Sequence, residues 1–211
     1  MIKTKTYIWI LLIASLLANA TPLRADSSTD REYQIKAAFI YNFIKFIDFP
    51  VEKIADDVDS ITIGVIGDAD YPIAFDPIKN KQVKGKNIVI KHFTEFDKLK
   101  ELQKKNDSRW KETIKELKKL QVLLVCFCKD EKPQIPVELL KALKDSGVLV
   151  IGEIPGFLEN GGVINFVMEN KKVRFEINAA AADRNGIKIR SQLLKLAKRV
   201  IKNKPQKEAN N

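Results

Sequence analysis

The residues best placed for ligand chemistry form a short turn after an apolar strand, Gly64-Val65-Ile66-Gly67-Asp68. In α/β proteins, a glycine-bearing turn between a strand and a helix is where phosphates and nucleotides bind. This turn lacks both the G-x-G-x-x-G spacing of a dinucleotide site and the Gly-Lys-Ser/Thr ending of a P-loop. We therefore interpret it as a tight strand-to-helix turn, with Gly67 and Asp68 as the candidate ligand contacts.

The other reactive side chains do not form a catalytic or metal-binding set. His92 is the one histidine, and its place inside a strand pattern indicates a structural role. Carboxylates are so frequent that a pair such as Asp68 with Glu153 or Glu176 does not indicate acid–base chemistry. The sequence therefore predicts a binding protein without enzymatic activity, cofactor or bound metal.

The two cysteines, Cys126 and Cys128, lie one residue apart in an apolar run. In a strand their side chains share a face, where a direct disulfide would be strained. Two buried reduced thiols are the favoured interpretation, and an intermolecular or redox role is the alternative. The pair and a single histidine are too few for a zinc site.

The glycine-punctuated loop 153–162 is the best candidate for recognition of a partner. It carries Phe157 and Leu158 between predicted core strands, and loops on a rigid scaffold often bind. Phe157 is either an interface anchor or a side chain folded back into the core. On the following strands, Arg174 and Glu176 could bind a partner or pair with each other. The predicted partner-binding set is Phe157, Leu158, Asn165, Arg174, Glu176 and Asn178.

Apolar strands alternate with helical segments, which predicts a three-layer α/β/α fold around a mostly parallel sheet. Core strands are expected at 61–66, 87–93, 122–128 and 148–151, followed by a C-terminal hairpin with arms at 163–168 and 172–178. Asp30 and Ser191 are the expected caps of the first and last helices. Helices are expected at 31–46, 71–79, 96–105, 109–119, 137–144, 179–185 and 191–200.

The first predicted helix is apolar around most of its circumference, so more than one of its sides should be buried. One stripe contains Ile40 and Ile44, and a second contains Phe39, Phe43 and Phe46. The second stripe lies inside the monomer or contacts another subunit. We expect a homodimer in which Phe39, Phe43 and Phe46 form the contact.

The two ends of the chain differ from the predicted domain at 31–202. Residues 1–20 combine two lysines, a short apolar run and the small-x-small sequence Ala18-Asn19-Ala20, the pattern of a cleaved signal peptide. Residues 21–30 form a polar leader, and 203–211 a polar tail expected to be disordered. The chain is therefore expected to be exported; the family resemblance given below implies the periplasm as its destination.

The formal net charge is +10, and removal of Lys3 and Lys5 with the signal peptide leaves +8. Such a charge can indicate nucleic acid binding, which an exported protein rarely encounters. A solvated basic surface is the simplest interpretation. The functional alternative is an acidic partner or an anionic membrane surface.

Four phrases follow one another in the second half of the chain: VLVIGE at 148–153, GFLENGGVINFV at 156–167, VRFEIN at 173–178, and the ending 180–197 with SQLLKLA. In this order they resemble the signature of the YfiR family of small bacterial periplasmic proteins. Near the start, Tyr41-Asn42-Phe43 leads to a phrase that ends in Phe49-Pro50, with Phe49 where the family usually has tryptophan. The resemblance covers roughly residues 31–200.

The resemblance implies an α/β fold and a regulatory role without catalysis. The founding member of the family restrains a membrane-bound diguanylate cyclase through its periplasmic part, and an outer-membrane lipoprotein relieves the restraint. By resemblance, this chain binds an inner-membrane signalling protein, a diguanylate cyclase or a sensor kinase, and so controls cyclic-di-GMP and biofilm formation. The alternative is a periplasmic small-ligand module acting with a sensor kinase or an outer-membrane receptor.

Overall fold

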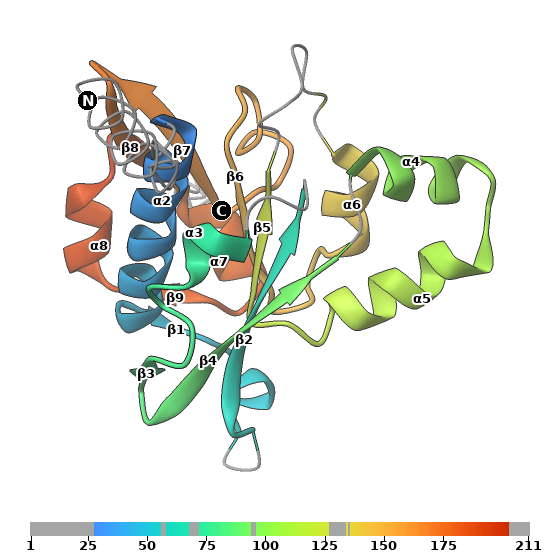
Figure 1. Cartoon of the computed structure of the whole chain (residues 1–211), viewed down its shortest axis with the longest axis horizontal. Coiled ribbons are helices and arrows are strands. Elements are labelled where there is room, and N and C mark those ends of the chain that lie inside the picture. The colour runs from blue at the N-terminus through green and yellow to red at the C-terminus, as the bar shows by residue number, and fades with distance from the viewer. Residues whose placement is uncertain are drawn as a thin grey trace, which may run out of the picture.

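A mixed, mostly parallel sheet of eight strands forms the centre of the protein (Figure 1). The computed structural model describes residues 28–55, 58–67, 72–93, 96–126, 134 and 136–202. The strand order is β10-β8-β7-β6-β5-β2-β4-β3. The strands are β2 (Ser60–Ile66), β3 (Gln82–Val83), β4 (Lys86–His92), β5 (Val122–Val125), β6 (Leu149–Gly152), β7 (Ile164–Glu169), β8 (Lys172–Asn178) and β10 (Val200–Ile201).

Parallel pairing joins β4, β2, β5, β6 and β7. The apolar runs of the central strands β5 and β6 are fully buried, as expected for strands covered on both faces. β8 returns antiparallel to β7 through the turn at Asn170 and Lys171, which both have positive φ. These pairings confirm the predicted α/β fold with a mostly parallel sheet and a C-terminal hairpin.

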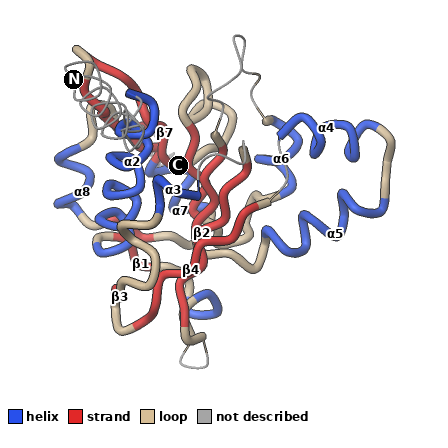
Figure 2. Tube along the Cα trace, in the orientation of Figure 1, coloured by secondary structure: helices blue, strands red, loops and turns tan. Residues whose placement is uncertain are grey.

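Helices cover both faces of the sheet, and each face has its own hydrophobic cluster (Figures 1 and 2). One cluster includes residues of α2, α3, α7 and α8, and the other includes residues of α4, α5 and α6. The three expected layers are therefore present. The helices are α2 (Ser28–Lys45), α3 (Pro72–Phe75), α4 (Phe96–Lys104), α5 (Ser108–Leu117), α6 (Val137–Ala142), α7 (Ala179–Arg184) and α8 (Ser191–Leu196).

Helix α2 lies against the β7–β8 hairpin through a cluster of aromatic rings. The Phe43 ring centroid is 4.8 Å from that of Phe175 and 5.8 Å from that of Phe166. Phe39 is partly buried against the same two rings, and Phe46 is also partly buried. Edge-to-face and offset rings at these separations add to the stabilisation from burial. Phe43 is therefore a core residue, which corrects its expected place in a dimer contact.

Phe157 and Leu158 also lie in the core, with 0% and 1% of their surfaces exposed. The expectation that they contact a partner directly is therefore wrong. A Cβ atom at Gly152 would lie 2.5 Å from the Phe157 ring, and one at Gly162 would overlap the ring from another position. Gly152 and Gly162 therefore leave space for the Phe157 ring to fold back into the core. The spacing of glycines in the sequence did not distinguish this arrangement from an exposed interface anchor.

The ends of several elements differ from their predicted positions. The first helix begins at Ser28, so Asp30 lies within it. The last helix ends at Leu196 instead of continuing to 200, because Val200 and Ile201 pair with β8 as β10. Arg190 occupies the N-cap position of α8, so Ser191 is its first helical residue and not its cap.

The predicted strand at 122–128 stops at Val125, so Cys126 follows the strand and is buried. Cys128, Asp68 and the segments 1–27 and 203–211 lie outside the described residues. The expectations for the signal peptide, the polar tail and the cysteine pair therefore remain predictions.

A second, two-stranded sheet fixes the end of α2 to the C-terminal region. β1 (Ile47–Asp48) pairs antiparallel with β9 (Lys188–Ile189). Arg190 donates hydrogen bonds to Asp48, and Lys84 adds an ion pair at 2.9 Å. Hydrogen bonds from Arg190 and Lys84 lower the pKa of Asp48 to about 2. Within the described residues, no helix has the length and apolar character needed to cross a membrane.

Replacing Phe157 with alanine should lower the free energy of unfolding by about 3–5 kcal/mol, because it leaves a cavity in the core beside Gly152 and Gly162. The urea midpoint measures this loss. Leu196→Ala is the control, because Leu196 is 67% exposed and its truncation should change stability by less than about 0.5 kcal/mol. Equal midpoints for the Phe157 and Leu196 variants would contradict the core placement.

Candidate functional site

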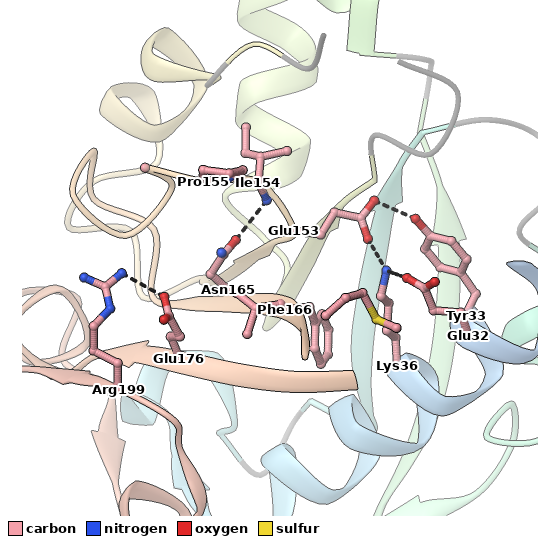
Figure 3. A pocket seen from close by; sticks show the side chains of 13 residues that line it. Glu32, Tyr33, Lys36, Glu153, Ile154, Pro155, Asn165, Phe166, Glu176 and Arg199 are labelled. Atoms are coloured by element: carbon pink, nitrogen blue, oxygen red, sulfur yellow. Dashed lines mark hydrogen bonds and ion pairs between the residues drawn. The ribbon is translucent and has the colours of Figure 1, made fainter. Parts of the chain in front are cut away.

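A pocket of about 630 Å³ lies between α2, the segment that follows β6, and the outer part of the β7–β8 hairpin (Figure 3). It lies beyond the carboxyl end of β6, the edge at which parallel α/β sheets commonly bind ligands. Its lining combines apolar and charged side chains: Glu32, Tyr33, Lys36, Glu153, Ile154, Pro155, Gly156, Asn165, Phe166, Val167, Met168, Glu176 and Arg199.

One side of the pocket is formed by a buried, charged hydrogen-bond network (Figure 3). Glu153 accepts a hydrogen bond from the Tyr33 hydroxyl at 2.6 Å and pairs with the Lys36 Nζ at 2.6 Å. Lys36 also pairs with Glu32 at 2.5 Å, one helical turn earlier. The side chains of Lys36 and Glu153 are only 4% and 8% exposed. The network therefore holds the first turns of α2 against the end of β6.

The charges in this network stabilise one another. Burial lowers the pKa of Lys36, but the charge of Glu153 and hydrogen bonds to Glu153 and Glu32 outweigh burial, so the pKa lies above the usual 10.5. A lysine with a raised pKa remains protonated at neutral pH and is a poor base or nucleophile. Among the described residues there is no group of three or more histidine, cysteine, aspartate or glutamate side chains that could hold a metal ion.

Asn165 fixes the backbone on the second side of the pocket. Its side-chain oxygen accepts a hydrogen bond from the Ile154 N–H at 3.1 Å, and the residue is buried. This hydrogen bond attaches the segment after β6 to the beginning of strand β7, eleven residues further along the sequence. Asn165 was predicted as a partner contact and is part of the pocket wall, where it orients the neighbouring loop.

Arg199 and Glu176 form the far side of the pocket. Arg199 donates hydrogen bonds to Glu176 and Glu159, each at 2.7 Å. The hydrogen bond from Arg199 lowers the pKa of Glu159, and the two carboxylates raise the pKa of Arg199. Glu176 was among the predicted site residues, and the structure places it in the pocket lining.

The other predicted polar contacts lie elsewhere. Arg174 is exposed on β8 with its Nε 4.0 Å from Glu169, outside the pocket lining. Asn178 is buried, donates to the Leu158 carbonyl at 2.8 Å and accepts from the Ala181 N–H at 2.9 Å. It caps α7, and its expected role in partner binding is therefore wrong.

Gly67 follows β2 with a φ of 154°, and a Cβ atom there would lie 2.7 Å from the Cβ of Cys126. The close approach of Cys126 therefore explains why position 67 is a glycine. Asp68 lies outside the described residues, so ligand binding by this turn remains a prediction.

Sequence analysis missed Tyr33, Lys36 and Arg199 as site residues. Lys36 was detectable in principle, because it lies between Tyr33 and Ala37 on the apolar side of the first helix. A lysine on a buried helix face requires a carboxylate or another acceptor nearby. Nothing in the sequence indicated that this carboxylate is Glu153, which lies 117 residues further along the chain.

An α/β domain whose pocket is built from mutually paired charges and apolar side chains has the character of a binding domain. The family profile described as YfiR/HmsC-like matches residues 33–198 of this chain. The chain belongs to the YfiR/HmsC-like family, which confirms the resemblance found in the sequence. No curated protein matched the chain.

One of two similar solved structures supports the α/β fold. The ABC domain in complex with L-Trp from Streptococcus pneumonia gives a TM-score of 0.52 at 13% identity, covering 81% of this chain and 60% of that one. A conserved domain protein from Vibrio cholerae gives a TM-score of 0.43 at 13% identity, covering 72% of this chain and 60% of that one. This chain spans about 60% of the length of each.

Replacing Lys36 with methionine should lower the free energy of unfolding by about 3–5 kcal/mol at neutral pH, because Glu153 loses a buried counter-charge. The double variant Lys36→Met/Glu153→Leu removes both charges and should recover most of the loss. Urea unfolding of the wild type, both single variants and the double variant gives the coupling free energy between Lys36 and Glu153.

The pH dependence follows from the raised pKa of Lys36. The stabilisation is fully present below pH 10.5 and is lost as the pH rises through the higher pKa of the folded state. The difference in stability between wild type and Lys36→Met should therefore shrink in strong alkali. A constant difference across that range would contradict a charge-based role.

Proposed function

We propose that this protein is a periplasmic regulator that restrains an inner-membrane signalling protein, a diguanylate cyclase, by binding its periplasmic part. Membership in the YfiR/HmsC-like family supports a periplasmic regulator in general terms. The cyclase, the mode of restraint and an outer-membrane lipoprotein that relieves it are parts of the proposal. Export through a cleaved signal peptide at 1–20 and assembly as a homodimer belong to it as well.

The observation that carries the proposal is the mixed character of the pocket. Its wall contains Ile154 and Phe166, and Met168 lies in its lining with 53% of its surface exposed. Protein interfaces commonly combine an apolar centre containing methionine or aromatic residues with a charged rim. The paired charges of Lys36 and Glu153 brace the surrounding backbone, which lowers the cost of ordering it when a partner binds.

Replacing Met168 with aspartate should release the restraint without unfolding the protein. The side chain is exposed, so the substitution should cost little stability, but it places a charge where a partner's apolar side chain would pack. Cellular cyclic-di-GMP should rise to the level seen when the gene is deleted. The matched control is Leu196→Asp, which changes an exposed leucine on α8, outside the pocket.

Two results would count against this proposal in different ways. If deletion of the gene leaves cyclic-di-GMP unchanged, the signalling partner is not a diguanylate cyclase. If deletion raises cyclic-di-GMP but Met168→Asp restrains the cyclase as well as wild type does, the partner does not use this pocket.

The second candidate is a small-ligand module that acts with a sensor kinase or an outer-membrane receptor. The pocket volume of about 630 Å³ favours it, because small-molecule sites usually lie between about 300 and 1,000 Å³. A thermal-shift screen of amphipathic metabolites, with L-Trp included because it is bound in the Streptococcus pneumonia domain, tests this candidate. A compound at about 100 times its dissociation constant should stabilise the protein by about 2.7 kcal/mol. Absence of any shift would exclude the compounds screened as ligands.

A further inference from the structure

The outer edge of β4 is incompletely paired within the described part of the chain. β3 covers only its beginning, where Gln82 pairs with Asn87 and Val83 with Lys86 (Figure 2). Ile88 exchanges backbone hydrogen bonds with Asn80 and Lys81. β4 continues for four residues beyond this point, to His92.

The direction of each backbone group follows from the ladder with β2. The N–H groups of Asn87 and Phe93 donate to carbonyls of and beside β2, so odd-numbered residues of β4 face β2. Ile88 bonds to the opposite side, as alternation requires. The N–H and C=O groups of Ile90 and His92 therefore point away from β2, and no described residue hydrogen-bonds to them. An edge of this kind can accept another strand.

The side chains at this edge are apolar and basic. Val89 is 42% exposed, and Ile90 is partly buried beside it. Segment 77–93 contains five lysines and no aspartate or glutamate. Lys84 pairs with Asp48 and Lys91 with Glu116, whereas Lys79 and Lys81 are exposed close to the open edge. Lys79 is exposed and directly precedes Asn80, whose N–H donates to the Ile88 carbonyl. Partial burial and the charge of Lys79 lower the pKa of His92. Like charges oppose pairing of this edge with a second copy of itself, and favour an acidic partner strand.

We propose that an acidic, extended segment of a partner protein binds the outer edge of β4 as an additional strand. Backbone groups of Ile90 and His92 supply the hydrogen bonds, and the surrounding lysines select negatively charged side chains. This inference rests on the proposed function, because it describes a second surface through which a regulator could hold its partner. It is separate from the pocket at β6 and β7.

The direct test uses amide hydrogen exchange of the whole protein with two short peptides, one alternating valine with glutamate and the other valine with lysine. The acidic peptide, at about ten times its dissociation constant, should slow exchange of the Ile90 and His92 amides about tenfold. The amides of Val89 and Lys91, which already face β2, should change little. The basic peptide should have no effect.

Two variants test the mechanism. Ile90→Pro removes an N–H that the fold does not use and should abolish peptide binding with little change in melting temperature. The double variant Lys79→Glu/Lys81→Glu reverses exposed charges only, so it remains informative if the proline disturbs the strand. It should lower the affinity for the acidic peptide about tenfold at low salt. Lys195→Glu, an exposed change on α8, is the control and should bind like wild type.

The proposal is overturned if neither amide is protected, or if the basic peptide protects them equally. It is also overturned if both amides become protected with rising protein concentration alone, because the edge then pairs with a second copy. Failure of the regulatory proposal is a different result: deletion of the gene leaves cyclic-di-GMP unchanged, whatever the peptides do.

Discussion

The ion pair between Lys36 and Glu153 is the constraint on which the pocket depends. It joins the first helix to the end of β6 across 117 residues of sequence, with both side chains nearly inaccessible to water. Two charges are stable in such a place only when each is satisfied by the other and by further hydrogen bonds. Tyr33 and Glu32 provide those bonds. The relative position of α2 and β6 is therefore set by electrostatic pairing as well as by apolar packing.

The strands were predictable because their apolar residues are local signals. The apolar run at 148–151 predicts a buried strand and the alternating segment 172–178 a half-buried one, and the structure has β6 and β8 at these places. The ends of elements were less predictable, because they depend on distant partners. Val200 and Ile201 continue a helical pattern in sequence, yet form a strand because β8 offers them an open edge. The role of Phe157, interface anchor or core side chain, could not be predicted for the same reason. Only the three-dimensional arrangement shows the space that Gly152 and Gly162 leave for its ring.

The candidate site was predictable in part. Asn165 and Glu176 were named from their strands, and both line the pocket. Asn178, on the same face as Glu176, instead caps a helix, because its strand ends there. The remaining charged residues of the pocket come from α2, from the end of β6 and from Arg199, and the alternation of residues within one strand cannot reveal them. Residues that meet through the tertiary fold require contact information that a single sequence does not contain.

The packing of Phe157 also restricts how this family can diverge. Its ring occupies the volume that two missing Cβ atoms would fill, one on each glycine. A change to alanine at either glycine is therefore tolerated only if position 157 becomes smaller, and a smaller residue at 157 leaves a void that such an alanine could fill. The three positions form one volume-conserving unit. Their identities should covary among relatives, whatever partner each relative binds.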